Sequence, residues 1–129
     1  MNLLLDTCAV LFLSADAPEI KDSTRSWVEQ SDSIFLASVT AAELACLQDR
    51  GRIELPDHWK PWFREAVSSN GWRVLPADWE VMEEAYSLPG TFHPDPADRM
   101  ITATARVHRL TILTTDRKLF KYPHVNAVW

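Results

Sequence analysis

The stretch Leu3-Leu4-Leu5-Asp6-Thr7 decides the fold of this 129-residue sequence. Three consecutive leucines are typical of a short strand buried on both faces, and the apolar run Ala9–Leu13 that follows predicts a helix. Asp6 lies at the junction of these two elements. A carboxylate this close to a buried strand is costly without a partner, so we expect Asp6 to face a cation or several hydrogen-bond donors. The backbone N–H groups of Thr7 and Cys8 could be such donors.

Apolar strands and helices alternate along the rest of the chain. Further strands are predicted at Ile34–Ala37, Trp72–Leu75, Thr111–Leu113 and near Val125–Val128. Helices are predicted at Asp22–Gln30, from Thr40 to Gly51, from Asp57 to Gly71, at Asp78–Ser87 and, after a loop over Leu88–Pro96 with Asp95 as cap, up to His108. This alternation predicts a single α/β domain over residues 1–129, with a mostly parallel sheet covered by helices on both faces.

Three further acidic residues have ordinary structural explanations. Glu43 is the third residue of a capping box that Thr40 would begin. Asp98 lies in the first turn of its helix, where the helix dipole stabilises a carboxylate. Asp116 could cap a short turn over Arg117–Phe120. Each of these residues, taken alone, is explained without a catalytic role.

Taken together, Asp6, Glu43, Asp98 and Asp116 predict a metal site. Ligands of parallel sheets bind beyond the carboxyl ends of the strands, and all four residues are expected at that edge. Carboxylates that share a pocket repel one another and require a counter-charge. Oxygen ligands without histidine or cysteine favour Mg²⁺ or Mn²⁺ over zinc. Such an ion acidifies water and neutralises phosphate oxygens, so the pattern is typical of a site that cleaves phosphodiesters.

Four motifs carry a resemblance to a known family. They are Leu3-Leu4-Leu5-Asp6-Thr7, Ser38-Val39-Thr40-Ala41-Ala42-Glu43-Leu44, Asp95-Pro96-Ala97-Asp98-Arg99-Met100-Ile101 and Leu113-Thr114-Thr115-Asp116. In this order they span nearly the whole chain and resemble the signature of PIN-domain ribonucleases. The segment Ala45–Leu55 adds a likeness to the VapC-type toxins of toxin–antitoxin systems.

The resemblance implies a three-layer α/β/α PIN-like fold and a Mg²⁺-dependent endoribonuclease, with Mn²⁺ as a possible substitute. It also implies a toxin that forms a homodimer and is inhibited by a cognate, VapB-like antitoxin protein. Asp6 and Asp98 would bind the metal directly, and Glu43 would bind it or orient its water. Asp116 would complete the cluster of acids, and Thr114 would support this cluster as a hydrogen-bond donor.

Three other functions are compatible with parts of this pattern. A housekeeping PIN-domain nuclease of RNA processing would carry the same acids. A non-catalytic RNA-binding module could keep the fold, although such relatives usually lose acids. A phosphatase of the haloacid-dehalogenase type is disfavoured, because its D-x-D motif would need an acid where this sequence has Cys8.

The distribution of charge predicts an RNA-binding surface that the net charge of −5 conceals. Residues 1–98 hold 7 basic and 17 acidic side chains, whereas residues 99–129 hold 6 basic side chains and 1 acidic. Basic residues that neutralise phosphates supply much of the affinity for nucleic acids. We therefore expect RNA phosphates to be held by Arg106, Arg109, Arg117, Lys118 and Lys121, with a solvated helix face as the alternative.

The cysteines and the hydropathy suggest a soluble, cytoplasmic protein. Cys8 and Cys46 are far apart in apolar surroundings, so both are expected to be buried thiols in a reducing compartment. No apolar run approaches the length of a membrane span. No basic residue precedes Lys21, so the positive segment of a signal peptide is missing.

The aromatic residues and histidines are given structural roles. Trp59, Trp62 and Phe63 share one helical face, which predicts core packing or a groove for the inhibitory partner. That partner would place an arginine among the four acids. The histidines lack the spacing of metal ligands, so we assign them no place in the site; they are His58, His93, His108 and His124.

Overall fold

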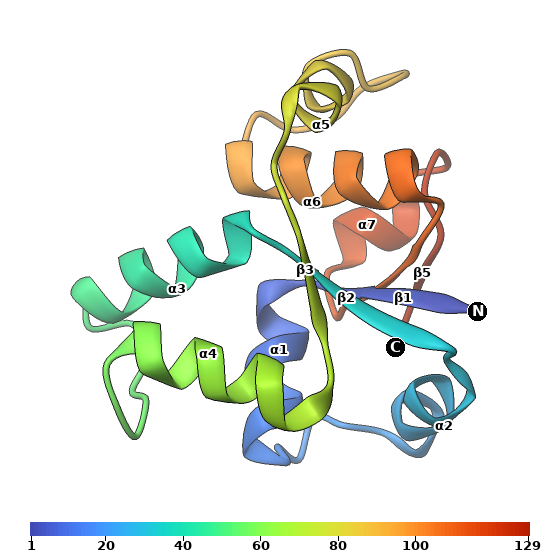
Figure 1. Cartoon of the computed structure of the whole chain (residues 1–129). Coiled ribbons are helices and arrows are strands. Elements are labelled where there is room, and N and C mark those ends of the chain that lie inside the picture. Colours follow the sequence, from blue (N-terminus) through green and yellow to red (C-terminus); the bar gives the residue numbers. More distant parts are fainter.

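A five-stranded parallel sheet forms the centre of the protein, whose computed structural model describes residues 1–129 (Figure 1). Leu4 of the first strand is in register with Phe35 and Ile112 of its two neighbours, and every pair of adjacent strands is parallel. The predicted sheet is thus confirmed, with the three-leucine strand in the middle. In the order β3-β2-β1-β4-β5, its strands are β1 (Asn2–Leu5), β2 (Ser33–Ala37), β3 (Arg73–Leu75), β4 (Thr111–Leu113) and β5 (Ala127–Val128).

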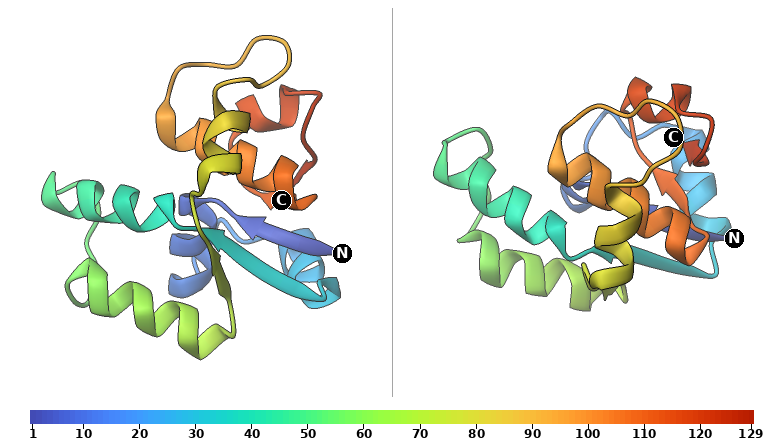
Figure 2. Two further views of the ribbon diagram at one scale, coloured as in Figure 1. Left: turned by 45° about the horizontal axis from the view of Figure 1, so that its top comes forward. Right: turned by 90° about the horizontal axis from the view of Figure 1, so that it is seen from above.

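Seven helices surround this sheet in the predicted three-layer arrangement. They are α1 (Thr7–Ala15), α2 (Asp22–Gln30), α3 (Val39–Asp49), α4 (Trp59–Asn70), α5 (Trp79–Ala85), α6 (Pro96–His108) and α7 (Arg117–Lys121). Figure 1 and Figure 2 show α1, α2 and α4 on one face, and α5, α6 and α7 on the other. Helix α3 extends away from the carboxyl end of β2. None of the helices combines the length and the apolar character needed to cross a membrane.

Side chains that alternate along the strands build a separate core on each face of the sheet. Leu5 packs with Val10 and Phe63 on the face covered by α1 and α4. Leu4 packs with Ile101 and other residues on the face covered by α6 and α7. Because both faces are covered, the leucines of β1 are fully buried, and each contributes roughly 2 kcal/mol of hydrophobic stabilisation.

Besides Asp6, which caps α1, three aspartates begin helices as the sequence predicts. Asp78, Asp95 and Asp116 each accept a hydrogen bond from a backbone N–H of the following helix, at 2.9 to 3.1 Å. The turn expected after Asp116 is helix α7. Gly71 ends α4 with a φ of +67°, a left-handed conformation that glycine adopts without a steric penalty.

Two predicted helix starts are wrong. Helix α3 begins at Val39, and no side chain caps it. The capping box of Thr40 and Glu43 does not form, because Thr40 lies inside the helix with its side chain fully buried. Helix α4 is capped by His58 instead of the expected Asp57. Glu43 therefore loses the structural explanation that the sequence suggested for it.

The prediction that both cysteines are buried is also wrong, since Cys8 and Cys46 are exposed and free. Helix α1 buries Thr7, Ala9 and Val10, but Cys8 lies on its open side. Apolar neighbours in the sequence do not imply burial, because successive residues of a helix point in different directions. Cys46 is exposed on α3 for the same reason.

The aromatic residues of α4 serve mainly the core. Phe63 is buried, and Trp59 and Trp62 are partly buried against the same cluster. Trp62 also borders a cavity of about 450 Å³, together with Leu11 and Ile53. The prediction of core packing is confirmed.

Candidate active site

The carboxyl edge of the sheet carries the four acids that the sequence singled out. Asp6 directly follows β1, and Asp116 follows β4 as the cap of α7. Glu43 lies in α3, which begins just after β2, and Asp98 lies in the first turn of α6. Figure 1 shows that α1, α3 and α6 all begin at this edge. The fold thus gathers acids from four separate parts of the chain.

Asp6 is the most buried member of this group, with 8% of its surface exposed. One carboxylate oxygen accepts a hydrogen bond from the Ala9 N–H at 2.8 Å, and the other accepts one from the Thr114 hydroxyl. Burial raises the pKa of Asp6 to about 6 against the effect of these two hydrogen bonds, and the charges of Asp116 and Glu43 raise it further. Asp6 therefore has hydrogen-bond donors, as expected, but they are Ala9 and Thr114 and not the N–H groups of Thr7 and Cys8 that the sequence suggested. Its charge is still incompletely compensated.

Thr114 connects two of the acids through its hydroxyl group. The hydroxyl donates to Asp6 and accepts a hydrogen bond from the Asp116 N–H at 2.9 Å. The Thr114 side chain is fully buried, so water does not compete for the hydrogen bonds of its hydroxyl group. The hydrogen-bond donor expected at Thr114 is confirmed.

Glu43 is held by Thr7, a contact that the sequence analysis missed. The Thr7 hydroxyl donates to Oε1 of Glu43 at 2.6 Å, which joins the start of α1 to α3. Burial raises the pKa of Glu43, the hydrogen bond from Thr7 lowers it, and the charge of Asp95 raises it. The only signal in the sequence was the position of Thr7 directly after Asp6, which does not reveal a partner 36 residues away.

Asp98 has the most strongly shifted carboxyl group of the four. Burial raises its pKa to about 7, and the neighbouring charges of Asp95, Glu43 and Asp116 add to this effect. Its Oδ2 lies 3.2 Å from Nε2 of His93, a residue to which the sequence analysis gave no role. His93 stands in the loop before α6 and stacks on the Phe92 ring at 4.6 Å, and this loop brings it back over the first helical turn.

Cys8 lies beside the acids although it is exposed. Partial burial of the thiol raises its pKa to about 11, and the charges of Asp6, Glu43, Asp116 and Asp98 all act in the same direction. One side chain thus senses the negative field of all four acids.

The acids are coupled electrostatically and are well suited to a divalent cation. No lysine or arginine forms an ion pair with any of them, and His93 is their one basic contact within 4 Å. The atoms that would coordinate a cation are carboxylate oxygens, which hard ions prefer. As placed here, no three histidine, cysteine or acidic side chains converge on one point, so the group is not a preformed coordination shell. The uncompensated charge is the observation that fits a cation.

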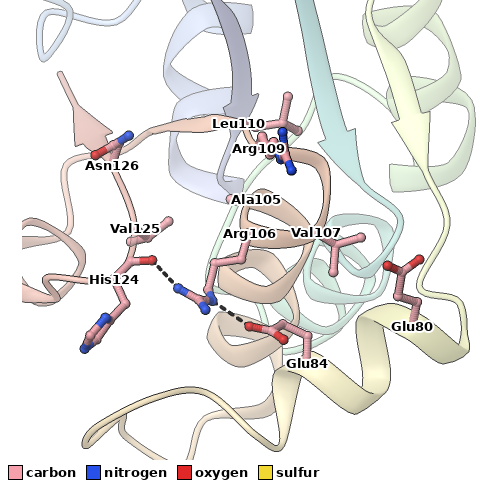
Figure 3. A pocket seen from close by; sticks show the side chains of 10 residues that line it. All are labelled: Glu80, Glu84, Ala105, Arg106, Val107, Arg109, Leu110, His124, Val125 and Asn126. Carbon is pink, nitrogen blue, oxygen red and sulfur yellow. Dashed lines mark hydrogen bonds and ion pairs between the residues drawn. The ribbon is translucent and has the colours of Figure 1, made fainter.

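The basic residues of the C-terminal third do not form one surface. Arg106 donates to Glu84 and to the backbone oxygen of His124, both at 2.6 Å, and these contacts fix its side chain (Figure 3). Arg106 and Arg109 line a cavity of about 490 Å³ with Leu110, which precedes β4. This cavity lies at the amino end of the strands, opposite the acids, and does not support the RNA contact expected of these two arginines.

Comparisons with known proteins agree with this architecture. The family described as PIN domain matches residues 3–125. Ribonuclease VapC22 of Mycobacterium tuberculosis (strain ATCC 25618 / H37Rv) is 30% identical over 130 residues, which cover 99% of this chain and 98% of that protein.

Solved structures with the same fold include two VapBC proteins bound to DNA. VapBC2 from Rickettsia felis, bound to a promoter DNA fragment, has a TM-score of 0.71 at 17% identity, and the match covers 100% of this chain and 99% of that one. DNA-bound VapBC from Salmonella typhimurium has a TM-score of 0.71 at 20% identity, with coverage of 99% and 97%.

The raised pKa of Asp98 predicts a specific pH dependence of stability in metal-free protein. Between its ordinary value of 3.8 and about 7, the folded chain keeps a proton that the unfolded chain has lost. The free energy of unfolding should therefore fall as the pH rises through this window. Urea unfolding in EDTA at pH 4 and pH 8 should show the parent losing roughly 2–4 kcal/mol relative to Asp98→Asn. A constant difference between the two proteins would contradict the raised pKa.

Proposed function

This chain belongs to the PIN domain family, and on that premise we propose that it is a Mg²⁺-dependent endoribonuclease that acts as the toxin of a toxin–antitoxin pair. The observation that carries the proposal is the group of coupled acids at the carboxyl edge of the sheet, with which no lysine or arginine forms an ion pair. The identity of 30% to a protein named as a ribonuclease supports the same conclusion. Residues 1–129 would form a single nuclease domain.

The proposed metal site uses the four acids in the roles expected from the sequence. PIN-domain nucleases depend on divalent metals, and ligation by oxygen alone favours Mg²⁺, with Mn²⁺ as a substitute. Asp6 and Asp98 would bind the ion directly, Glu43 would bind it or orient its water, and Asp116 would complete the group. The bound ion would neutralise charge on the phosphate oxygens and acidify a water molecule.

Neighbouring side chains orient the acids for metal binding. Thr114 fixes Asp6 relative to Asp116, and Thr7 fixes Glu43, so that two hydroxyl groups set the orientation of the carboxylates. His93 places its Nε2 at 3.2 Å from the Asp98 carboxylate. Because the pKa values of Asp6 and Asp98 are about 6 and 7, both carboxyls are partly protonated near neutral pH and must release protons when a cation binds.

The proposed partners are RNA, an antitoxin protein and a second copy of the chain. The structural neighbours include a toxin–antitoxin complex from Klebsiella pneumoniae, which supports an antitoxin partner here. An arginine of that partner would compete with the metal for the carboxylates. Its apolar side chains would enter the cavity beside Trp62. We also propose that the protein acts in the cytoplasm, where its RNA substrate is found.

Substitution of the two direct ligands should abolish RNA cleavage without unfolding the protein. Asp6→Asn and Asp98→Asn each remove a charge and preserve shape, and we expect a loss of at least about 100-fold, because even outer partners of metal ligands often contribute 10–100-fold. Cleavage of a labelled RNA in Mg²⁺, with circular dichroism as a folding check, measures this. Asp78→Asn is the matched control, since Asp78 caps α5 outside the acid group. A folded Asp98→Asn protein that cleaves RNA at the parental rate would contradict the role of Asp98 as a metal ligand.

Cys8 should report metal binding independently of activity. A cation among the acids lowers the pKa of the nearby thiol, so Mg²⁺ should speed the labelling of Cys8 by a thiol reagent, by roughly several-fold at pH 8. The measurement uses a Cys46→Ser protein, so that a single thiol reacts. Asp98→Asn in the same background should show a smaller acceleration. Labelling that does not respond to Mg²⁺ or Mn²⁺ at any concentration would count against a metal at this position.

Expression in bacteria separates a toxin from a housekeeping nuclease. The intact chain alone should arrest growth, because its proposed nuclease activity would act without an inhibitor, whereas Asp98→Asn should accumulate without harm. Growth curves after induction, with immunoblots for protein level, provide the measurement. Equal and harmless accumulation of both proteins would reject the toxin while leaving an RNA-processing nuclease possible.

A further inference from the structure

A groove of about 680 Å³ lies beside the acids and has a different chemical character. Three basic side chains and two aromatic rings line it, together with Thr115; they are Lys21, Arg117, Lys121, Phe120 and Trp129. Glu19 is its one acidic residue, so the lining is net positive. We call this surface the basic groove. It stands out because the first 98 residues of the chain are strongly acidic overall.

The short helix α7 supplies most of the basic groove. Arg117, Phe120 and Lys121 are spaced three and four residues apart, so they share one face of the helix. Leu119 turns the opposite way and is buried in the core, which fixes the orientation of the helix. Lys118 does not line the groove. The fold thus selects two of the basic residues that the sequence grouped together and adds Lys21 from the segment before α2.

Phe120 is an exposed aromatic residue, with 47% of its area accessible, and it lines the groove together with three basic side chains. Trp129 is held in place, because its indole N–H donates to the backbone oxygen of Glu19 at 3.0 Å and its ring meets the edge of Phe12. An exposed ring beside basic side chains is the combination by which proteins bind single-stranded nucleic acid. Bases stack on the ring while cations neutralise phosphates.

The basic groove is continuous in the chain with the acid group. Thr115 and Arg117 line the groove and stand directly before and after Asp116. A strand of RNA with its scissile phosphate at the acids therefore has its neighbouring nucleotides within reach of α7. Duplex RNA fits this arrangement poorly, because its bases are paired and cannot stack on a side chain.

We propose that the basic groove binds the single-stranded RNA that adjoins the scissile phosphate. Lys21, Arg117 and Lys121 hold phosphates, and Phe120 stacks with a base. This inference rests on the proposed ribonuclease function and adds the residues of this chain that hold the substrate beside the acids. The charge of the groove opposes that of the acids, so RNA is attracted to α7 and is held at the acids only when metal is present.

Binding of a labelled single-stranded RNA of about 12 nucleotides to the full chain in EDTA tests the proposal without cleavage. Phe120→Ala should weaken binding roughly ten-fold, and Phe120→Trp should restore it. The double variant Arg117→Ala, Lys121→Ala should reduce the slope of affinity against salt by about 1.4, from two lost phosphate contacts. Arg64→Ala on α4 is the matched charge control and should bind like the parent.

Further arms decide between the possible outcomes. A duplex of the same sequence should bind Phe120→Ala and the parent alike. A loss for Lys118→Ala equal to that for Arg117→Ala would replace the groove by a diffuse basic surface. If the parent cleaves RNA in Mg²⁺ while the groove variants bind like the parent, the groove is wrong and the nuclease stands. If binding depends on Phe120 but the parent never cleaves, the nuclease is wrong and the groove stands.

Discussion

The structure depends on a carboxylate buried at the carboxyl end of its central strand. Asp6 caps α1 through the Ala9 N–H and accepts a hydrogen bond from Thr114, so one side chain ties β1, α1 and the end of β4 together. Thr114 in turn accepts from the Asp116 N–H, which sets the start of α7. Burial of a charge requires such donors, and the pKa of about 6 shows that they do not fully offset it. The part of the Asp6 charge that these donors leave uncompensated is available to a cation.

The sequence predicted the sheet because its signals are local. A run such as Leu3–Leu5 is apolar whatever its neighbours do, and the position of Asp6 after it follows directly. Contacts between distant side chains have no such signal. Thr7 reaches Glu43, and His93 reaches Asp98, only because helices and a loop meet at one edge.

Helical phase explains the errors in the same way. Cys8 and Thr40 were assigned from neighbouring residues, whereas their exposure depends on which way each helix faces the sheet. The same holds for the basic residues of the C-terminal third. Counting charges along the chain groups these residues together, although the fold places them on different surfaces. Arg106 pairs with Glu84 at the far end of the strands, while Lys121 faces a groove shared with Lys21. The net charge of a segment can be counted from the sequence, but the surface on which each charged side chain lies cannot.

The order of the strands also governs when this protein becomes complete during synthesis. The central strand precedes its neighbour β4 along the chain by most of the fold, and the bond between Thr114 and Asp6 spans 108 residues. Chains emerge from the ribosome with the N-terminus leading. A nascent chain that has reached only β3 can pair β1 with β2, but it lacks both Asp98 and Asp116. The acid group therefore stays incomplete during synthesis until the segments that carry Asp98 and Asp116 have left the ribosome.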